Sequence, residues 1–158
     1  MKKHSLNNRD RKILTKYVDS LSLMSLATTN GKTLWSATVF YLYDEDLNIY
    51  FLSATNTRHC KNISRKNDVS LTIATSSQKH KDKKVGLQIS GKANKVTSLK
   101  QTKDLILMWN SRFKGGLKID YKIMIKIWKS RFYKIEPKEI QFYNEKLYKK
   151  EDLKIWKM

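Results

Sequence analysis

The sequence LSATNTRHCKNI, residues 52–63, combines several hydroxyl groups with Arg58, His59 and Cys60, the only cysteine of the chain. We expect a strand end, a turn and the start of a helix capped by Thr57 or the asparagine before it. Cations oppose the dipole at a helix N-terminus. However, free N–H groups, hydroxyl groups and an arginine that grips two oxygens favour a phosphate. This stretch therefore indicates an anion site, and a solvated basic helix face is the alternative.

Other kinds of reactive site find less support in the sequence. The tripeptide GKT at 31–33 lacks the earlier glycine of a phosphate-binding loop, because Leu26 stands there. The histidines lie far apart, and the adjacent His59 and Cys60 would diverge on a helix, so we expect no metal site. No paired-carboxylate motif occurs among the 14 acidic residues. A borrowed cofactor, or no catalysis at all, is the expectation that follows.

The composition predicts a globular protein with a strong positive charge. Hydrophobic residues make up 40% of the 158 residues and aromatic residues 11%, while the formal net charge is +19. Such a charge suits a polyanion, but the basic residues are spread along the chain, as a lysine-rich composition alone would give. We find no apolar run of a membrane helix and no signal peptide, and we expect a cytoplasmic protein with no nucleic-acid partner.

Hydrophobic periodicity predicts the elements that position residues 52–63. The apolar residues of 9–21 recur at helical spacing, and Asn8 or Ser5 could cap this helix. Strands follow within 23–44, joined at Asn30-Gly31, the strongest short hairpin signal. The remaining expected elements of this half are a hairpin through 44–48 into a strand at 49–54, a helix from about 57 to 66, and strands at 69–75 and 84–96.

The last third of the chain is expected to be helical first and then extended. Thr97 or Ser98 would cap a helix at 99–113. Residues 117–128 fit both a strand and a helix face; a basic amphipathic helix would suit a membrane surface, but we expect no membrane partner. The segment 131–144 reads as a strand, a turn at Pro137 and another strand. Residues 153–157 could add a short edge strand.

Several short motifs occur in an order that is typical of one family. These motifs are LAT at 26–28, Gly31, SATVFY at 36–41, YFLS at 50–53, TRH at 57–59, VGLQISGKANKV at 85–96 and YKIEPKEIQFYN at 133–144. In this order they resemble the pyridoxamine 5'-phosphate oxidase-like, FMN-binding split-barrel family. A second set is similar to an uncharacterised bacterial subgroup of that family, which brings no known reaction; it comprises ATVFYLYD at 37–44, TRH, WNSRF at 109–113 and KIW at 154–156.

The resemblance implies a fold that is mainly β with flanking helices (α+β), a six-stranded antiparallel split β-barrel. It implies one split-barrel domain over residues 1–158. It also implies a homodimer with the flavin at the interface. The segments of this domain would be an N-terminal helix at 1–22, the barrel core at 23–96, a helical insertion at 97–128 and closing strands at 129–158.

The resemblance also implies an FMN site. The strand from Ser36 would run beside the flavin ring, largely through backbone atoms, and Arg58 would hold the phosphate with nearby hydroxyl groups. The family often has lysine in place of His59, and its oxidases have an arginine in place of Ser36, so pyridoxamine phosphate is not the expected substrate. Gln88 would either reach the flavin edge or face solvent. The implied site comprises Ser36, Ala37, Thr38, Val39, Phe40, Tyr41, Leu52, Ser53, Thr57, Arg58, His59 and Gln88.

We therefore expect an FMN-binding protein that acts as a flavin-dependent oxidoreductase on an unknown small molecule. A non-catalytic flavin-binding or haem-binding protein is the first alternative, with His59 or His80 as the haem ligand. A basic nucleic-acid-binding barrel is the second alternative. The aromatic residues that could stack bases in such a barrel are Tyr41, Tyr43, Tyr50 and Phe51.

Three residues near the end of the helix expected at 99–113 have two possible roles. Trp109, Arg112 and Phe113 would either line the pocket mouth or cap the barrel.

Overall fold

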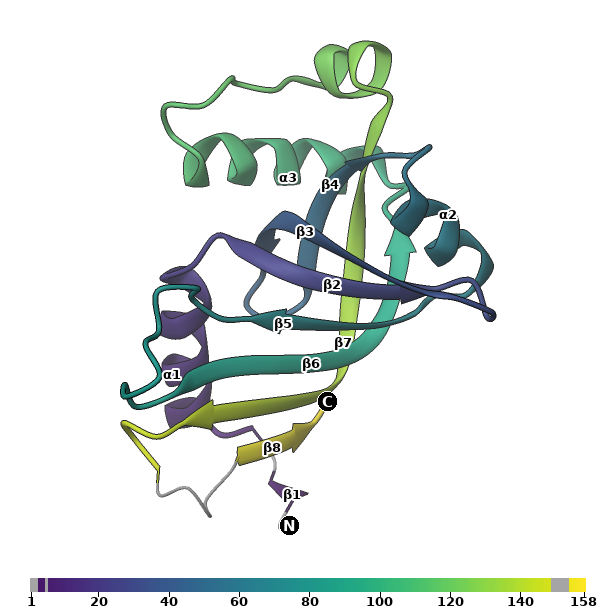
Figure 1. Ribbon diagram of the computed structural model, residues 1–158. Coiled ribbons are helices and arrows are strands. Elements are labelled where there is room, and N and C mark those ends of the chain that lie inside the picture. The colour runs from purple at the N-terminus through teal and green to yellow at the C-terminus, as the bar shows by residue number, and fades with distance from the viewer. Residues whose placement is uncertain (1–2, 5, 149–153) are drawn as a thin grey trace.

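A closed antiparallel barrel of six strands forms the centre of the molecule (Figure 1). The computed structural model describes residues 3–4, 6–148 and 154–158. A short strand β8 (Lys154–Lys157) pairs with β7, and β1 (Lys3–His4) lies parallel to β8. The predicted six-stranded antiparallel barrel is thus confirmed. Its strands, in order round the barrel, are β2 (Leu23–Thr29), β3 (Leu34–Tyr43), β4 (Ile49–Ala54), β7 (Ser130–Asn144), β6 (Val85–Lys95) and β5 (Asp68–Ile73).

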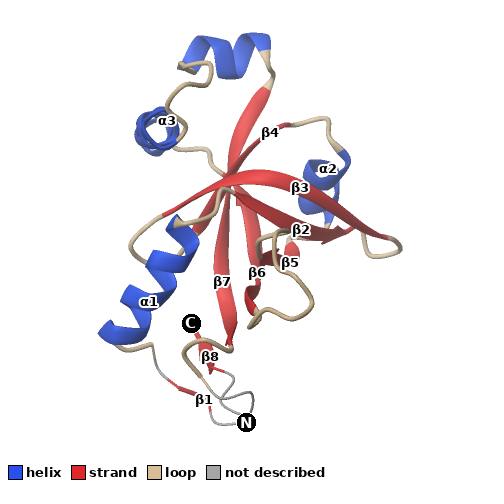
Figure 2. Ribbon diagram, turned by 60° about the vertical axis from the view of Figure 1, so that its left-hand side comes forward, coloured by secondary structure: helices blue, strands red, loops and turns tan. Residues whose placement is uncertain are grey.

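The helices lie outside the strands (Figure 2). They are α1 (Asn8–Asp19), α2 (Arg58–Arg65), α3 (Leu99–Arg112) and the π-helical turn η1 (Ile123–Ile127). The Asn7 side chain caps α1 by accepting a hydrogen bond from the Asp10 N–H at 2.8 Å. The expected caps, Asn8 and Ser5, were therefore wrong. Within the described residues, no helix combines the length and the apolar character that crossing a membrane requires.

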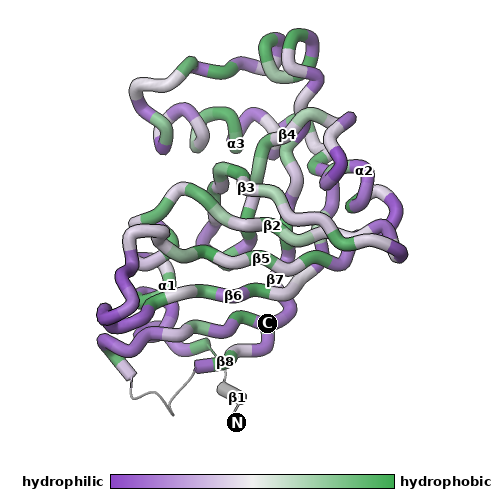
Figure 3. The backbone as a smooth tube through the Cα atoms, in the orientation of Figure 1, coloured by the Kyte–Doolittle hydropathy of each residue, from purple (hydrophilic) through white to green (hydrophobic). Residues whose placement is uncertain are grey.

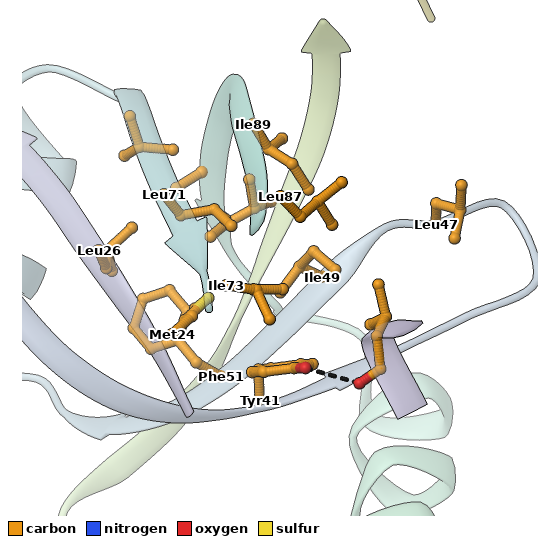
Figure 4. Close-up of a cluster of buried hydrophobic side chains, with 14 of the residues drawn as sticks. Met24, Leu26, Tyr41, Leu47, Ile49, Phe51, Leu71, Ile73, Leu87 and Ile89 are labelled. Carbon is orange, nitrogen blue, oxygen red and sulfur yellow. Dashed lines mark hydrogen bonds between the residues drawn. The ribbon is translucent and has the colours of Figure 1, made fainter. Parts of the chain in front are cut away.

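Alternating side chains of the strands fill the barrel with apolar groups, as Figure 4 shows. Tyr41 is fully buried there, and its hydroxyl group lies 2.6 Å from the Val18 carbonyl oxygen of α1. Phe51 is also fully buried, and Tyr50 is only 4% exposed. Three of the four aromatic residues considered for base stacking therefore belong to the cores, so the barrel does not present them to nucleic acid.

A second apolar cluster joins the insertion between β6 and β7 to the barrel. Leu105 and Ile106 of α3 and Met124 of η1 are buried there against Phe132 of β7. The Trp128 N–H donates to the Ile123 carbonyl oxygen at 3.0 Å, the five-residue spacing of a π-helical turn. Residues 123–127 are thus helical. The strand interpretation of 117–128 was wrong for this part, because packing of the helical face decides between two patterns that fit equally well.

Strand β7 continues through Pro137 without the predicted turn. Its pairing with β6 shifts register between Ser90 and Gly91, where Gly91 stands opposite Pro137. A Cβ atom on Gly91 would lie 2.3 Å from the Glu136 carbonyl oxygen, so only glycine permits this close approach. An irregularity of this kind tolerates proline, because no ladder hydrogen bond from its nitrogen is needed. The predicted hairpin within 131–144 is therefore a single bent strand.

Candidate functional site

Three polar side chains meet where β4 ends and α2 begins. The Oγ atom of Ser53 lies 2.7 Å from Nε2 of His59 and 3.3 Å from Oγ1 of Thr57. Nε2 of His59 also lies 3.2 Å from Oγ1 of Thr57. The strand end and the helix start predicted at 52–63 thus bring these side chains into one hydrogen-bonded group. We call Ser53, Thr57 and His59 the β4–α2 corner.

The first turn of α2 has neither a side-chain cap bond nor an acidic residue. Thr57 occupies the cap position, but its hydroxyl group donates to the Ala54 carbonyl oxygen at 2.9 Å and makes no side-chain cap bond. The N–H groups at the start of a helix have no partner within the helix. The corner therefore places the unpartnered N–H groups of α2 next to the Ser53 hydroxyl group, a combination that suits a phosphate group.

His59 contributes hydrogen bonding without charge near neutral pH. Its side chain is buried, and the Phe51 ring lies edge-on to it at 6.0 Å between centroids. Burial lowers the pKa of His59 below its usual value, because the charged imidazolium form loses its hydration. A phosphate at the corner would thus meet a neutral ring that offers one nitrogen to Ser53 and Thr57.

Arg58 is the cation nearest to the corner in sequence, and it is exposed. Its guanidinium carbon lies 4.3 Å from the centroid of the Trp35 ring, and Nη2 lies 3.5 Å from Oγ1 of Thr33. These contacts connect the start of α2 to the start of β3. Among the described residues, no carboxylate forms an ion pair with Arg58. Its charge therefore remains available for an anionic ligand.

The barrel is split beside this corner, because β4 pairs with β3 only at Tyr41–Tyr43. The Tyr41 N–H points to the side of β2 and donates to the carbonyl oxygen of Ser22, the residue before this strand. Since hydrogen-bonding direction alternates along a strand, the backbone groups of Ser36, Thr38 and Phe40 point to the opposite edge. No described strand pairs with that edge. It offers free backbone donors and acceptors on the side of β3 that leads to β4.

The predicted residues of β3 fall on two faces. Ala37, Val39 and Tyr41 lie on the inner face, where Tyr41 is fully buried and Val39 packs against the barrel core. Ser36, Thr38 and Phe40 are exposed on the outer face. The strand can therefore meet a flat ring along its free edge through backbone atoms. The Tyr41 side chain is engaged in the core. Leu52 of β4 is also engaged, because it packs against the second cluster.

Gln88 does not join the corner within one chain. It is exposed on β6, and its Oε1 atom accepts a hydrogen bond from Gln141 at 2.9 Å. Gln88 lies opposite Thr72, Thr72 opposite Ser25, and Ser25 opposite Thr38 of β3. At about 4.8 Å per strand, Gln88 is on the order of 14 Å from Thr38 along the sheet.

Two residues that the sequence analysis overlooked lie beside the corner. Arg131 of β7 stands directly opposite Ser53, and its guanidinium group donates to the Ser130 carbonyl oxygen at 2.9 Å. Trp35 lies under the guanidinium group of Arg58. A tryptophan next to the SATVFY motif was a local signal. The position of Arg131 depends on the pairing of strands far apart in the sequence, which no local pattern indicates.

Arg112 and its neighbours fasten the insertion to the barrel. Arg112 donates to the Leu21 carbonyl oxygen at 2.6 Å and forms an ion pair with Asp19 at 2.8 Å, where α1 ends. The Phe113 ring lies edge-on to Phe40 with the centroids 5.3 Å apart. Arg112 and Phe113 also line a cavity beside Asp19 and Leu21, so the structure is compatible with both alternatives for residues 109–113.

No family model matches the sequence, and no curated protein matches it either. Solved structures do match. A candidate pyridoxamine 5'-phosphate oxidase from Listeria innocua is similar over 85% of this chain and 98% of its own, with a TM-score of 0.67 and 16% identity. General Stress Protein 26 from Bacillus anthracis matches over 94% of this chain and 98% of its own, with a TM-score of 0.66 and 12% identity.

HutZ from Vibrio cholerae, described as a heme storage protein, covers 80% of this chain and 88% of its own. Its TM-score is 0.64 and its identity 14%. At such identities the shared property is the architecture. The resemblance of the sequence motifs is thus confirmed at the level of the fold: this chain has the pyridoxamine 5'-phosphate oxidase-like split-barrel fold.

Proposed function

We propose that this protein binds FMN at the split between β3 and the β4–α2 corner. The observation that carries this proposal is the pairing of an open α2 N-terminus with an unpaired β3 edge. Arg58 contacts Trp35 and Thr33, so its guanidinium group lies within reach of both elements. FMN is a planar ring that carries a phosphate. It requires hydrogen-bond donors for the phosphate and a strand edge whose backbone groups can bond to the ring.

Each residue of the proposed site has a distinct task. The first N–H groups of α2 and the Ser53 hydroxyl group orient the phosphate, and the Thr57 hydroxyl group joins them by turning from the Ala54 carbonyl oxygen. Arg58 balances the charge of the phosphate by moving from the Trp35 face. His59 fixes the Ser53 hydroxyl group through Nε2. The backbone of Ser36, Thr38 and Phe40 holds the ring at the free edge of β3.

The proposed activity is that of a flavin-dependent oxidoreductase acting on a small molecule in the cytoplasm. Bound flavin supplies hydride and electron transfer, and the chain supplies anchoring, orientation and exclusion of water. No side chain of the corner is assigned as a catalytic acid or base. His59 is neutral and already engaged with Ser53 and Thr57, so its role is to position the phosphate donors.

A homodimer would complete the site, and one face of the barrel supports this part of the proposal. Strands β2 and β3 contain no charged residue, and β5 contains only Asp68, although 30% of all residues are charged. The exposed row formed by Thr38, Ser25, Thr72 and Gln88 crosses this face. Interfaces are depleted of charge at their centre. A second copy seated here would bring its Gln88 towards the first copy's β3.

The absorption spectrum of the purified protein tests the proposal. After incubation with FMN and removal of the free cofactor, we expect a yellow protein that absorbs near roughly 450 nm. The control is the same incubation with riboflavin, which lacks the phosphate. Retention of FMN over riboflavin supports the corner as the phosphate site. Failure to retain either compound contradicts the proposal.

Haem binding is the second candidate, favoured by the likeness in fold to the heme storage protein HutZ. His59 is poorly suited to be the haem ligand, because it is buried and its Nε2 atom is hydrogen-bonded to Ser53. His80, in the loop before β6, is exposed. A strong band near roughly 400 nm after incubation with haem, lost in His80→Ala, supports this candidate. The same band in both proteins excludes His80 as the ligand.

A further inference from the structure

The part of the insertion that lies between α3 and β7 exposes large apolar side chains to solvent. Leu117 is 71% exposed, Ile127 65%, Tyr121 46% and Trp128 37%. We call residues 114–129 the insertion patch. It lies at the end of the molecule opposite to β1 and β8 (Figures 1 and 2). Apolar groups on this scale have a cost in water, which indicates that another surface covers them.

The same segment is strongly basic. Lys114, Lys118, Lys122, Lys126 and Lys129 are all exposed. The ion pairs of the described residues are made at Asp19, Asp68 and Glu136, and none involves these lysines. Figure 3 shows hydrophilic and hydrophobic positions alternating along this part of the tube. The patch therefore interleaves unpaired positive charge with exposed apolar groups.

The fold holds this arrangement in place. Met124 is fully buried in the second cluster, and Ile119 is 3% exposed. The Asp120 carboxylate accepts a hydrogen bond from the Ile123 N–H at 2.7 Å, at the start of the π-helical turn. Because Met124 and Ile119 fix the segment against the second cluster, Ile127 and Trp128 remain outside the core. Their exposure therefore follows from the way this segment packs.

Charge decides between the possible partners of the patch. In a two-fold symmetric dimer the same patch meets itself, which would place the five lysines opposite five others. The charge-free face of β2, β3 and β5 suits a second copy better. Nucleic acid would pair with the lysines but would leave Leu117 and Ile127 in water. A membrane surface rich in anionic lipids satisfies both groups at once.

We propose that the insertion patch docks the protein on an anionic membrane surface. Leu117 and Ile127 enter the boundary between headgroups and acyl chains. Trp128 and Tyr121 lie at headgroup level, where their rings meet apolar groups and their polar atoms meet water. The lysines contact anionic headgroups while their methylene groups lie along the apolar boundary. This proposal is independent of the cofactor and concerns where the protein works.

Sedimentation of the full-length protein with lipid vesicles tests the proposal. We expect binding to vesicles of equal parts phosphatidylcholine and phosphatidylglycerol, and none to phosphatidylcholine alone. The double variant Leu117→Ser/Ile127→Ser keeps the charge and is expected to bind about tenfold more weakly, because it loses apolar burial in lipid. The matched control Leu107→Ser/Leu147→Ser replaces two exposed leucines outside the patch and is expected to bind like the wild type.

A second pair of variants separates the patch from the general charge of the protein. Lys118→Gln/Lys122→Gln is expected to weaken vesicle binding more than Lys81→Gln/Lys83→Gln, which removes the same charge from the loop before β6. Equal losses in the two pairs would overturn the proposal, as would unchanged binding of Leu117→Ser/Ile127→Ser. A dimer that this variant converts to monomers without lipid would assign the patch to a second copy. A parallel loss of duplex DNA binding would assign it to nucleic acid.

Discussion

His59 shows how one buried side chain links the candidate site to stability. Burial lowers its pKa, so the folded protein favours the neutral ring. In the unfolded chain the pKa returns to about 6.5. The unfolded state therefore binds the proton more readily as the pH falls below this value. The contribution to stability is fully present above about pH 6.5 and is lost as the pH falls through the folded-state pKa.

His59→Gln is expected to remove this part of the pH dependence. Glutamine can still bond to Ser53 but does not titrate in this range. Urea unfolding midpoints at about pH 7.5 and about pH 5 measure the effect. The wild type should lose more stability between the two values than the variant does. In His80→Gln, an exposed control, the wild-type loss should persist. A variant with the same loss as the wild type would show that His59 is not responsible.

The sequence predicts the site residues that lie close together along the chain better than those brought in by other strands. Ser53, Thr57 and His59 meet as expected, because they lie within seven positions of one strand-to-helix corner. Arg131 was missed because it approaches Ser53 through the pairing of β4 and β7, and Trp35 was missed although it adjoins the SATVFY motif. Within one chain Gln88 lies three strands away from Thr38 of β3, so its predicted approach to the flavin edge would need the proposed second copy and stays a prediction.

At the scale of elements, the register of β6 and β7 decides how the barrel closes. Gly91 permits the close approach of Glu136 and Pro137, and the bend of β7 follows from it. The sequence predicted a turn here because proline usually interrupts a strand. Periodicity cannot show that a glycine on another strand will accommodate the proline. For residues 117–128 the sequence left strand and helix open for a similar reason, because packing against the second cluster selects the helical pattern.

Gly91→Ala is expected to destabilise the protein by about 2 kcal/mol or more, because the new methyl group meets backbone that cannot retreat cheaply. The matched control is Gly86→Ala on the same strand, where the added Cβ would lie 3.8 Å from the Ala74 Cβ. Chemical unfolding of both variants measures the difference. Equal stability of the two variants would mean that the close approach at Gly91 carries no constraint.

For the whole molecule, the outer face of β2, β3 and β5 determines the expected assembly. Thr72 lies at the centre of this face, between Ser25 and Gln88. In the proposed dimer Thr72→Lys would bury two like charges close to each other, so this dimer should dissociate at least about tenfold more readily. Sedimentation velocity over a concentration series measures this change. Ser77→Lys in the following loop is the control with the same added charge.

A monomeric wild type would contradict the proposed dimer, and an unchanged Thr72→Lys dimer would assign the interface to another face.

We also propose that residues 1–158 unfold as one unit, because Tyr50 and Phe132 connect the insertion to strands β4 and β7. Fluorescence and circular dichroism should then give coincident unfolding transitions. Two separate transitions would show that the insertion melts independently of the barrel.

The central claim is that Arg58 and the β4–α2 corner hold the phosphate of FMN. The most direct measurement compares the affinities for FMN and riboflavin in the wild type, Arg58→Ala and the control Arg65→Ala at the other end of α2. Removing a charged partner should shrink the preference for FMN by about tenfold or more in Arg58→Ala alone. An equal preference for FMN in all three proteins, each shown to be folded, would contradict the claim.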